Sequence, residues 1–384
     1  MFGHLNHHRH LYNGALHERI DAYQKHGISI KYNDQQKSLT EIRGFDSGYK
    51  NIPVYSARMT LRRLDKAFKS FFRRVGQGQK PGFPRFKSRS RFKSFEMCKH
   101  GIGWKFIAND EKGKHGKLWI KGIGYIKARG KARHQGTVKS CTVKYDKDKW
   151  WVSVVIECEP TRDAQPTQSC GIDWGVEHLL TVTHQDGSYY HIDNPRWFQD
   201  NKEKLVELQQ DVSRKKKGSN RWKKACKRLS RFHAKTARKR KEHHHQLSAC
   251  LAERYALVAS EELDIQAMSA SAKGTEDNPG QNVRQKSGLN REILDTAPAT
   301  LIANIRYKVE ETGSWYFETP TKTLKPSQRC PWCWAVAQKD LDERTHDCAH
   351  CGLKMPRDAA SSMVNILWAL QQVAGREPAF QDSS

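Results

Sequence analysis

The sequence predicts an α+β protein of two or three domains, and three observations support this. The chain has 384 residues, which exceeds the usual size of one domain. Apolar residues recur at helical spacing in some stretches and alternate with polar residues in others. Lys and Arg number 68 against 41 Asp and Glu, a formal net charge of +27. A charge of that size favours a polyanionic partner, with nucleic acid as the first candidate and an anionic membrane surface as the rival.

No stretch approaches the apolar length needed to span a bilayer, and the opening MFGHLNHHRH lacks the pattern of a signal peptide. We therefore expect a cytoplasmic protein with no membrane partner. Six of the ten cysteines are scattered singly, and four form two CxxC pairs. In a reducing compartment this arrangement favours metal binding over disulfides.

The N-terminal half predicts helices followed by strands. We expect helices over 4–26 and 54–75, the second with an apolar face opposite a basic one. The stretch PGFPRFKSRSRFKSF (81–95) is broken by Pro and Gly and rich in bases and Phe. From there to about residue 158, alternating runs such as KLWIKGIGYIKA and WWVSVVIECE predict a small antiparallel β domain. EPTRDAQPTQS (159–169) is typical of a linker.

An acid interrupts the next strand-like run. CGIDWGVEHLLTVT (170–183) predicts a strand that continues to about Val182, and it contains Asp173. A buried lone carboxylate is costly unless something pairs with it, so partners for Asp173 must come from elsewhere in the chain. HQDGS then predicts a turn, and YYHID a second strand.

Residues 196–258 predict a long helical region with an unusual charge pattern. Between Arg214 and Lys241 there are fifteen Lys or Arg and no acid. Self-repulsion along such a helix favours contact with phosphates, although a solvated surface is the alternative.

The segments that follow predict a strand, a loop and a helix. LVASEELDI (257–265) is typical of a strand that ends in acids, and the polar stretch 269–290 predicts a mobile loop. Apolar residues then recur with helical period to Val309, with Thr296 as a candidate cap before Pro298.

Two cysteine pairs predict a structural zinc site. CPWC and CAHC are separated by fourteen residues (334–347), and each CxxC turn can present both sulfurs to one ion. The alternative is four free cysteines, whereas a redox dithiol needs only one such pair. All four positions would be filled, leaving none open for water. The expected ligands are Cys330, Cys333, Cys348 and Cys351.

Asp173, Glu261 and Asp358 each occupy the edge of an expected element with apolar neighbours, the last at the start of a short amphipathic helix over 358–370. Three clustered carboxylates repel one another unless divalent cations bind them, and Mg²⁺ prefers oxygen ligands. Two such ions about 4 Å apart activate water and stabilise a leaving 3′ oxygen. Taken singly, each acid is equally well explained as a cap, a strand-edge charge or a salt-bridge partner.

Several motifs, in order, resemble a known family. GIDWGVEHLLTV is similar to the first RuvC motif of the TnpB family, transposon-associated RNA-guided nucleases related to type V CRISPR effectors. ASEELDIQAM resembles the second motif, which assigns the catalytic acid to Glu261 rather than Glu262. SQRCPWC…CAHCGLKMPRDAASSMVNIL resembles the zinc ribbon running into the third motif, which assigns the last acid to Asp358. NPRWF, SRKKKGSNRWKKACKRL, KPGFPRFKSRSRFKSF and LYNGAL extend the likeness over nearly the whole chain.

The resemblance implies a fold and a set of domains. It implies an N-terminal wedge-like β-barrel with a helical insert, then an RNase H-like RuvC α/β domain with an inserted zinc ribbon. The implied boundaries are 1–30 for the helical start, 31–80 for a helical recognition insert, 81–165 for the barrel, 166–325 for the RuvC domain with basic helices, 326–355 for the zinc ribbon, 356–374 for the final RuvC segment and 375–384 for a flexible tail.

The resemblance also implies an activity and its partners. It implies a cytoplasmic enzyme on a bacterial or archaeal nucleoid that binds a noncoding guide RNA and target double-stranded DNA. Such an enzyme recognises a short motif beside the target and cuts DNA with two Mg²⁺ (or Mn²⁺) ions at Asp173, Glu261 and Asp358, with one structural Zn²⁺. The candidate nucleic-acid contacts are Arg58, Arg62, Arg63, Arg85, Lys87, Arg214, Lys215, Lys216, Lys217, Arg221, Lys224 and Arg228. For the first three, which we expect to face the adjacent motif, an ordinary solvated helix face is the alternative.

Three positions depart from the family pattern. The chain opens almost directly into a helix, so the expected barrel lacks its usual first strand. Ala360 stands where the family often has Asn, while Asn365 lies about two turns after Asp358 on nearly the same face. Trp334 replaces the usual Gly, from which we expect a distorted first knuckle.

Two other functions compete with an active nuclease. A guided repressor would bind without cutting, but the acids at all three positions favour the enzyme. A strand-transferring transposase also uses an acid triad, and an RNase H-like fold alone does not separate these activities.

Overall fold

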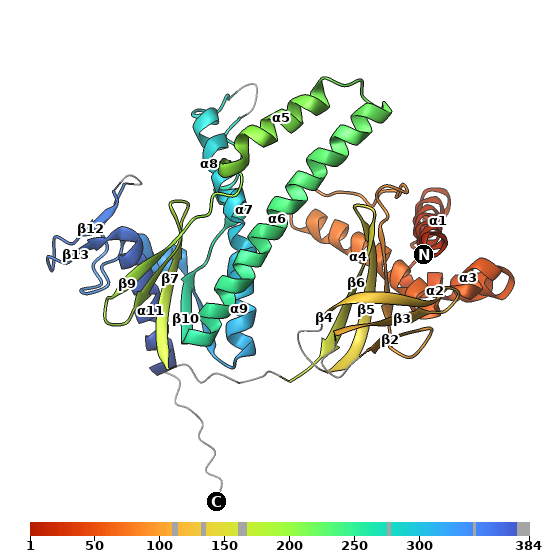
Figure 1. The fold of residues 1–384 in the computed structure, drawn as a ribbon, viewed down its shortest axis with the longest axis horizontal. Helices are drawn as coiled ribbons and strands as arrows, with labels where there is room; N and C mark the ends of the chain where they lie inside the picture. The colour runs from red at the N-terminus through yellow and green to blue at the C-terminus, as the bar shows by residue number, and fades with distance from the viewer. Residues whose placement is uncertain (110–113, 132–135, 160–166, 275–277, 341–342, 375–384) are drawn as a thin grey trace, which may run out of the picture. The chain divides into compact units, whose positions relative to one another are not determined.

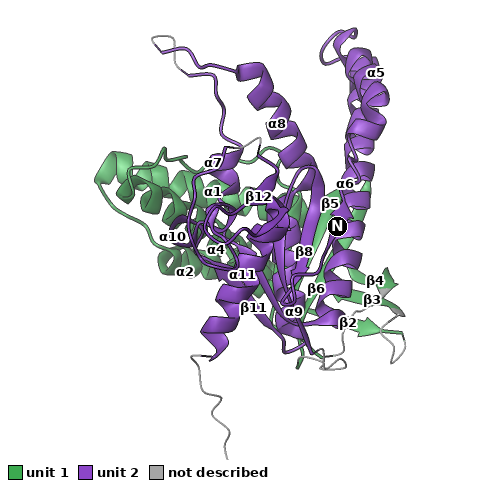
Figure 2. Cartoon of the chain, turned by 90° about the vertical axis from the view of Figure 1, so that its left-hand side faces the viewer, with its two compact units in different colours: residues 1–159 green, residues 160–384 purple. Residues whose placement is uncertain are grey.

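The computed structural model describes residues 1–109, 114–131, 136–159, 167–274, 278–340 and 343–374. The chain divides into two compact units, Met1–Glu159 and Pro160–Ser384 (Figure 2). The tail expected at 375–384 and most of the linker expected at 159–169 lie outside the described residues. No described helix combines the length and the hydropathy needed to cross a bilayer.

Unit 1 begins with four helices: α1 (Phe2–His26), α2 (Tyr32–Phe45), α3 (Ser47–Asn51) and α4 (Val54–Gly76). The first and last confirm the helices expected at 4–26 and 54–75. Gly27 ends α1 in the left-handed conformation (φ 66°), and its N–H donates to the carbonyl groups of the last turn.

Two separate three-stranded antiparallel sheets follow the helices. One has the order β1-β5-β6, and the other is the meander β2-β3-β4. Their bounds are β1 Ser94–Cys98, β2 Trp104–Ala108, β3 Lys114–Ile120, β4 Gly124–Lys131, β5 Thr137–Asp146 and β6 Lys149–Glu157.

The expectation of a closed β-barrel over 81–165 is therefore wrong for the described strands, because no ladder joins the two sheets. The physical reason lies between β1 and β2. Gly101 and Gly103 take positive φ angles (90° and 77°) and redirect the chain, so that β1 pairs with β5 while β2 pairs with β3.

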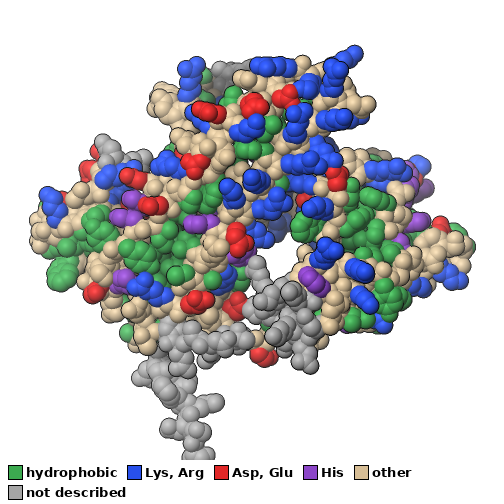
Figure 3. Space-filling view, viewed as in Figure 1, with side chains coloured by type: hydrophobic (Ala, Val, Ile, Leu, Met, Phe, Trp, Pro, Cys, Tyr) green, Lys and Arg blue, Asp and Glu red, His purple; other side chains and the backbone are tan. Residues whose placement is uncertain are grey.

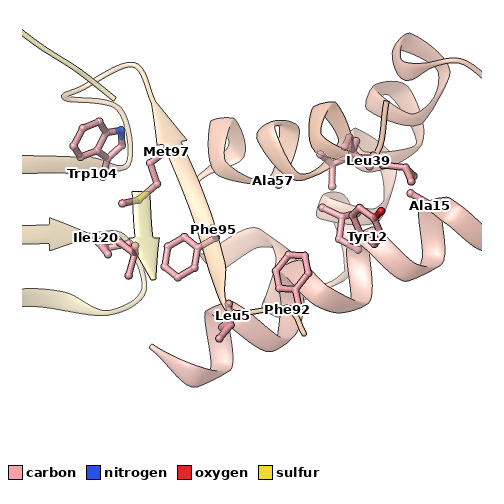
Figure 4. Close-up of a cluster of buried hydrophobic side chains, with 14 of the residues drawn as sticks. Leu5, Tyr12, Ala15, Leu39, Ala57, Phe92, Phe95, Met97, Trp104 and Ile120 are labelled. Atoms are coloured by element: carbon pink, nitrogen blue, oxygen red, sulfur yellow. The ribbon is translucent and has the colours of Figure 1, made fainter. Parts of the chain in front are cut away.

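The helices and sheets of unit 1 share one apolar core (Figure 4). Tyr12 and Ala57 contribute to it from the helices, and Phe95, Met97 and Trp104 from the strands. Because these residues come from both parts of the unit, the helices and the strands stabilise each other.

A buried histidine lies within this core. His8 is fully buried and stacks on Phe95, with ring centroids 4.9 Å apart. Its Nδ1 lies 2.8 Å from Oγ1 of Thr60, and its Nε2 lies 3.2 Å from Oγ of Ser56. Burial lowers the pKa of His8 to about 3, so the imidazole is neutral in the folded protein.

Unit 2 is built on a five-stranded mixed sheet of order β11-β10-β7-β8-β9 (Figure 1). β7, β8 and β9 form an antiparallel meander, while β10 runs parallel to both β7 and β11. The bounds are β7 Gln168–Trp174, β8 His178–His184, β9 Tyr189–Asp193, β10 Tyr255–Glu261 and β11 Trp315–Thr319.

The single strand expected up to Val182 is two strands. The chain turns after Trp174 at Gly175 and resumes at His178, so that Asp173 pairs with Thr181 of the returning strand. Both strands are apolar and buried, and their hydropathy therefore does not mark the turn between them.

The helical region expected over 196–258 is a hairpin of two helices. After the 3₁₀ turn η1 (Gln199–Asn201) come α5 (Lys202–Ser213) and α6 (Asn220–Arg254). Gly218 takes φ 89° between them, and the Ser219 hydroxyl accepts a hydrogen bond from the Trp222 N–H to cap α6.

Two further helices correct the expectations for the next segment. After α7 (Ile265–Met268), α8 (Val283–Thr296) occupies part of the expected loop 269–290, whose residues 275–277 lie outside the described residues. Thr296 ends α8 rather than capping the next helix, since its hydroxyl donates back to the carbonyl of Ile293. The N-terminal flanking residue of α9 (Pro298–Glu311) is Ala297, at φ 45°.

The sheet of unit 2 is covered on both faces. Residues of α6, α8 and α9 pack with Ile172 and Val258 on one face. On the other face Ile366 and Ala369 of α11 (Arg357–Ala374) pack with Leu257 and Ala259 of β10. The short elements α10 (Thr321–Leu324), η2 (Pro326–Gln328), β12 (Thr345–Asp347) and β13 (Lys354–Pro356) precede α11.

Candidate functional site

The three predicted acids come from three elements of unit 2. Asp173 lies near the end of β7, Glu261 is the last residue of β10, and Asp358 is the second residue of α11. Side chains alternate between the faces of a strand, and Ile172 packs on the α9 face, so Asp173 points to the α11 face. Ala259 packs with α11, so Glu261, two residues later, shares that face. The structure therefore brings all three acids to one side of the sheet.

The acids act on one another electrostatically. Burial, then the charges of Glu261 and Asp358, raise the pKa of Asp173 well above its ordinary value, and Arg357 opposes this. Burial, then Asp358, raise the pKa of Glu261 to about 7. Like charges that penalise each other's ionisation in this way are typical of a cation site, because a bound cation removes the repulsion.

The spacing of the acids limits how they can bind metal. Among the described residues, the four cysteines are the only group of three or more His, Cys, Asp or Glu ligand atoms that all lie within 4.8 Å of one another. The acid cluster is therefore more open than a site in which one ion contacts all three carboxylates. Two ions about 3.5–4 Å apart, each held by some of the acids, suit a wider arrangement.

A row of polar side chains extends from Asp173 across the sheet. Asp173 pairs with Thr181 of β8, and Thr181 pairs with His191 of β9, so the three side chains lie on one face. The Thr181 Oγ1 lies 3.0 Å from Nδ1 of His191. The His191 ring stacks on that of His178, with centroids 4.0 Å apart.

His191 was not among the residues predicted from sequence. Burial, then the charge of His178, lower its pKa, while Asp358 is among the groups that raise it, so His191 lies within electrostatic range of the acids. The alternation in YYHID marks His191 as facing the same way as Tyr189, but only the strand register connects it with Asp173.

Buried polar contacts fix α11 on the sheet. Asn365 is fully buried, its Oδ1 accepts a hydrogen bond from Thr319 Oγ1 (2.7 Å), and its Nδ2 donates to the carbonyl of Ile172 (3.3 Å). Asn365 thereby connects α11 to the strands on either side of β10. Ala360, at the position where an amide is expected from the family pattern, is buried.

The four predicted cysteines come together beside the N-terminus of α11. Sγ of Cys330 lies 3.6 Å from that of Cys351, and Sγ of Cys333 lies 3.5 Å from that of Cys348. These distances are too long for disulfides and close to the edge of about 3.8 Å for a tetrahedron with Zn–S bonds of about 2.3 Å. Donor set and spacing thus fit a zinc ion.

The two CxxC turns have the same backbone geometry. The N–H of Trp334 donates to the carbonyl of Cys330 (3.0 Å), as that of Gly352 does to Cys348 (2.8 Å). Trp334 takes φ 62° and Gly352 takes φ 75°. The first knuckle is therefore not distorted, because Trp334 adopts the left-handed conformation despite its side chain.

Basic side chains gather on the α5–α6 hairpin, at the top of Figure 3. Most of the predicted contacts there are exposed. Two of them are paired, since Lys215 and Arg228 both form salt bridges with Asp211. The exposed predicted residues on this hairpin are Arg214, Lys216, Lys217, Arg221, Lys224 and Arg228.

The predicted basic residues of unit 1 differ in environment. Arg62 and Arg85 are exposed, and Arg58 lies over the ring of Tyr55. Arg63 donates to the carbonyl of Ser94 at 2.8 Å, and burial lowers its pKa. Part of its guanidinium is therefore hydrogen-bonded inside the unit.

Lys87 is held differently from the other basic residues of unit 1. Its backbone N–H donates to Oδ1 of Asn13, whose Nδ2 donates in return to the carbonyl of Lys87. Its Nζ lies 5.8 Å from the ring centroid of Tyr12. These contacts anchor the basic segment 81–95 to α1.

Two protein-family models match the chain. A family described as "Probable transposase" matches residues 152–272, and one described as "Cas12f1-like, TNB domain" matches residues 299–366.

Two curated relatives and one solved structure are similar over most of the chain. "Putative RNA-guided DNA endonuclease InsQ" of Escherichia coli strain K12 is 31% identical over 339 residues, covering 86% of this chain and 79% of the relative. "Putative RNA-guided DNA endonuclease" of Streptomyces pristinaespiralis is 28% identical over 373 residues, covering 94% of this chain and 82% of the relative. The cryo-EM structure of Cas12f1 in complex with sgRNA and target DNA aligns with TM-score 0.60 at 14% identity, covering 95% of this chain and 82% of that one, and it shows a similar fold.

Proposed function

Because this chain belongs to the TnpB family of transposon-associated RNA-guided DNA endonucleases, we propose that it cuts DNA at sites selected by a bound guide RNA. In this proposal it recognises a short motif beside the target and hydrolyses phosphodiester bonds. The observation that carries the proposal is the convergence of Asp173, Glu261 and Asp358 on the α11 face of one sheet, where burial and the neighbouring carboxylates raise the pKa values of Asp173 and Glu261.

Asp173, Glu261 and Asp358 would hold two Mg²⁺ or Mn²⁺ ions. Bound there, the ions supply activation of water and stabilisation of the leaving 3′ oxygen. The chain itself supplies three carboxylates on rigid elements and a partly buried setting that strengthens electrostatic interactions. The Nε of Arg357 lies 3.7 Å from Oδ1 of Asp358, and the charge of Arg357 opposes the rise in the pKa of Asp173.

The fold assignment belongs to the same proposal. The order β11-β10-β7-β8-β9, with an antiparallel meander followed by two parallel strands, supports an RNase H-like RuvC domain. We assign 166–325 and 356–374 to that domain, 326–355 to a zinc ribbon, 1–30 and 31–80 to the helical start and recognition insert, and the two small sheets to the wedge region. The four-cysteine site is structural, because a tetrahedral set of thiolates leaves no position for a reacting water.

Charge supports a guide RNA and target DNA as partners. A polyanion relieves the repulsion among the bases of the α5–α6 hairpin, and backbone contacts of this kind bind without regard to sequence. Sequence selection would then come from pairing between guide and target.

The rival within the family is a guide-dependent repressor that binds without cutting. Intact acids at all three positions favour cleavage, since a repressor has no need of three mutually repelling carboxylates. The description "Probable transposase" of one matching family fits a strand-transfer enzyme with the same triad, which would join DNA ends rather than release them.

The test is to purify the protein, sequence the RNA that it carries, and reprogram the variable 3′ end of that RNA. We expect Mg²⁺-dependent cleavage at the programmed target, and we expect Asp173→Ala to keep the RNA but lose cleavage. Protein that emerges without RNA, or that cuts without a guide, contradicts the proposal. Guided binding without any cutting by the unaltered protein establishes the repressor instead.

A further inference from the structure

The outer face of the β2–β3–β4 sheet in unit 1 carries an arrangement that the proposed nuclease chemistry does not use. Its inner face supplies buried core residues, among them Trp104, Leu118 and Ile120. The strand register places Lys105, Trp119 and Tyr125 side by side in one row of the opposite face. The next row of that face consists of Ile107, Lys117 and Lys127.

Two aromatic rings form the centre of this outer face. Trp119 and Tyr125 are direct cross-strand partners, so their side chains are neighbours on the same surface. Tyr125 is 59% exposed and Ile107 is 44% exposed. The Nζ of Lys105 lies 6.0 Å from the ring centroid of Trp119 and 5.9 Å from that of Tyr125, a cation–π position over both rings.

Basic side chains surround the rings. Lys117, Tyr125 and Lys127 line a hollow of about 250 Å³. The described residues of the three strands include no acid, while Lys105, Lys117, Lys127 and Arg129 are all basic. An exposed Tyr125 beside a half-buried Trp119, with lysines around them, matches a ligand that combines a flat ring with a nearby negative charge.

We propose that this face binds unpaired nucleotides, with a base stacked on Tyr125 and Trp119 and the adjoining phosphates beside the three lysines. A base within a duplex is already stacked on both sides, so its flat surface is not available to a side chain, whereas an unpaired base offers it. The row of lysines beside the rings favours a partner that repeats a negative charge next to a flat ring, which a nucleic acid strand does at every nucleotide. The inference rests on the proposed function only for the identity of the natural ligand. Unpaired guide RNA and unpaired target DNA offer the same chemistry to this face.

The experiment maps contacts in the full-length protein. We would irradiate the protein at 254 nm with its co-purified RNA, and separately, after that RNA is removed, with a single-stranded oligouridylate, a single-stranded oligothymidylate or a duplex of equal length. Mass spectrometry of the cross-linked peptides should place nucleotides on the β3–β4 peptide that contains Tyr125. We expect cross-links with either single strand and none at this peptide with the duplex. Cross-links between Tyr125 and the co-purified RNA identify the guide RNA as the ligand of this face. Cross-links that form only with added single-stranded DNA identify the target strand as the ligand.

Variants separate stacking from charge. Tyr125→Ala should weaken single-strand binding between about fivefold and about a hundredfold, the range expected for one stacked base. Tyr125→Phe, which keeps the ring, should bind as the unaltered protein does, and so should Tyr23→Ala, which removes an exposed tyrosine (67% exposed) from α1. Lys127→Ala should lower the slope of log affinity against log salt by about 0.7, whereas Tyr125→Ala should leave that slope unchanged.

The outcomes distinguish this inference from the proposed function. Protein that carries RNA, yet gives no cross-link at Tyr125 and binds single strands equally well as Tyr125→Ala, overturns the inference and leaves the nuclease proposal standing. Protein that carries no RNA but cross-links added single strands at Tyr125 supports the inference while the nuclease proposal fails. Because Tyr125 is exposed, Tyr125→Ala should retain the circular dichroism spectrum of the unaltered protein.

Discussion

Gly171 of β7 lies directly against Ser362 of α11. A Cβ atom at position 171 would stand 1.7 Å from the carbonyl oxygen of Ser362 and 2.7 Å from its carbonyl carbon. Both neighbours are backbone atoms of a buried helix and have no room to move aside. The contact lies two residues before Asp173 and one helical turn after Asp358, so it sets the distance between the strand and the helix that carry these two acids.

Gly171→Ala should therefore lower the free energy of unfolding by about 3 kcal/mol, at the upper end of overpacking effects. Target cleavage should fall by about 100-fold, because displacement of a catalytic group by about 1 Å has an effect of that size. Urea unfolding and a cleavage assay measure the two effects. Gly288→Ala in α8 is the matched control: no atom lies within 4 Å of its added Cβ, so it should be neutral or stabilising by up to about 1 kcal/mol. Equal unfolding midpoints for the two variants would contradict the close approach.

Asn365→Ala should destabilise unit 2 by about 1–3 kcal/mol, because it removes two buried hydrogen bonds, one from the Thr319 hydroxyl and one to the Ile172 carbonyl, while Thr319 keeps its contact with the Ser260 carbonyl. Thr319→Val removes one of these contacts from the other side. A double-mutant cycle in urea should give a coupling energy of about 1 kcal/mol between the two positions. Strict additivity of the two substitutions would mean that the hydrogen bond contributes nothing to holding α11.

Removal of zinc should unfold the region of the four cysteines. We expect one zinc per chain by elemental analysis, lost with Cys333→Ser but kept with Cys250→Ser, which alters an exposed cysteine outside the cluster. A chelator should expose thiols of all four cysteines to a thiol reagent and lower the melting temperature. If Cys333→Ser still contained one zinc per chain, the four sulfurs would not form a single zinc site.

His8 should make unit 1 sensitive to acid. Its pKa is about 3 in the folded protein, below its ordinary value of 6.5, so the unfolded chain binds the extra proton first. The stability that this group contributes is complete above about pH 6.5 and is lost as pH falls toward 3, at about 1.4 kcal/mol per pH unit. His8→Gln, which stays neutral, should show a shallower loss of stability between pH 6 and pH 5 by that amount. His17→Gln, on the exposed side of α1, should follow the unaltered protein.

Local patterns in the sequence were sufficient for some parts of the structure. The helix at 54–75 has a clear helical periodicity of apolar residues, and the spacing of the CxxC pairs fits one tetrahedral ion. A charge at the edge of each apolar element marked the three acids as candidates, but the family resemblance grouped them into one site and selected Glu261 rather than Glu262. Taken alone, the local signal did not separate Asp173, Glu261 and Asp358 from caps, strand-edge charges or salt-bridge partners.

Features that depend on pairing could not be predicted. The turn at Gly175 is invisible because the strands on both sides of it are buried and apolar. The proximity of His191 to Asp173 follows only from the register of three strands. The absence of a ladder that would close a barrel depends on which strands β1 and β2 pair with. Trp334 was expected to distort its turn, but the backbone there takes the left-handed conformation (φ 62°), which its side chain disfavours, and the turn keeps the geometry of the second knuckle.

The position of Asp358 on α11 also has a consequence for protein synthesis. While the ribosome is still adding α11, β7 and β10 have already emerged with two of the three acids, but no third carboxylate is present to complete the set. A nascent chain that ends before α11 therefore lacks the complete set of acids, and the set forms only when α11 packs on the sheet. Under the function proposed above, cleavage could therefore begin only after nearly the whole chain has been synthesised.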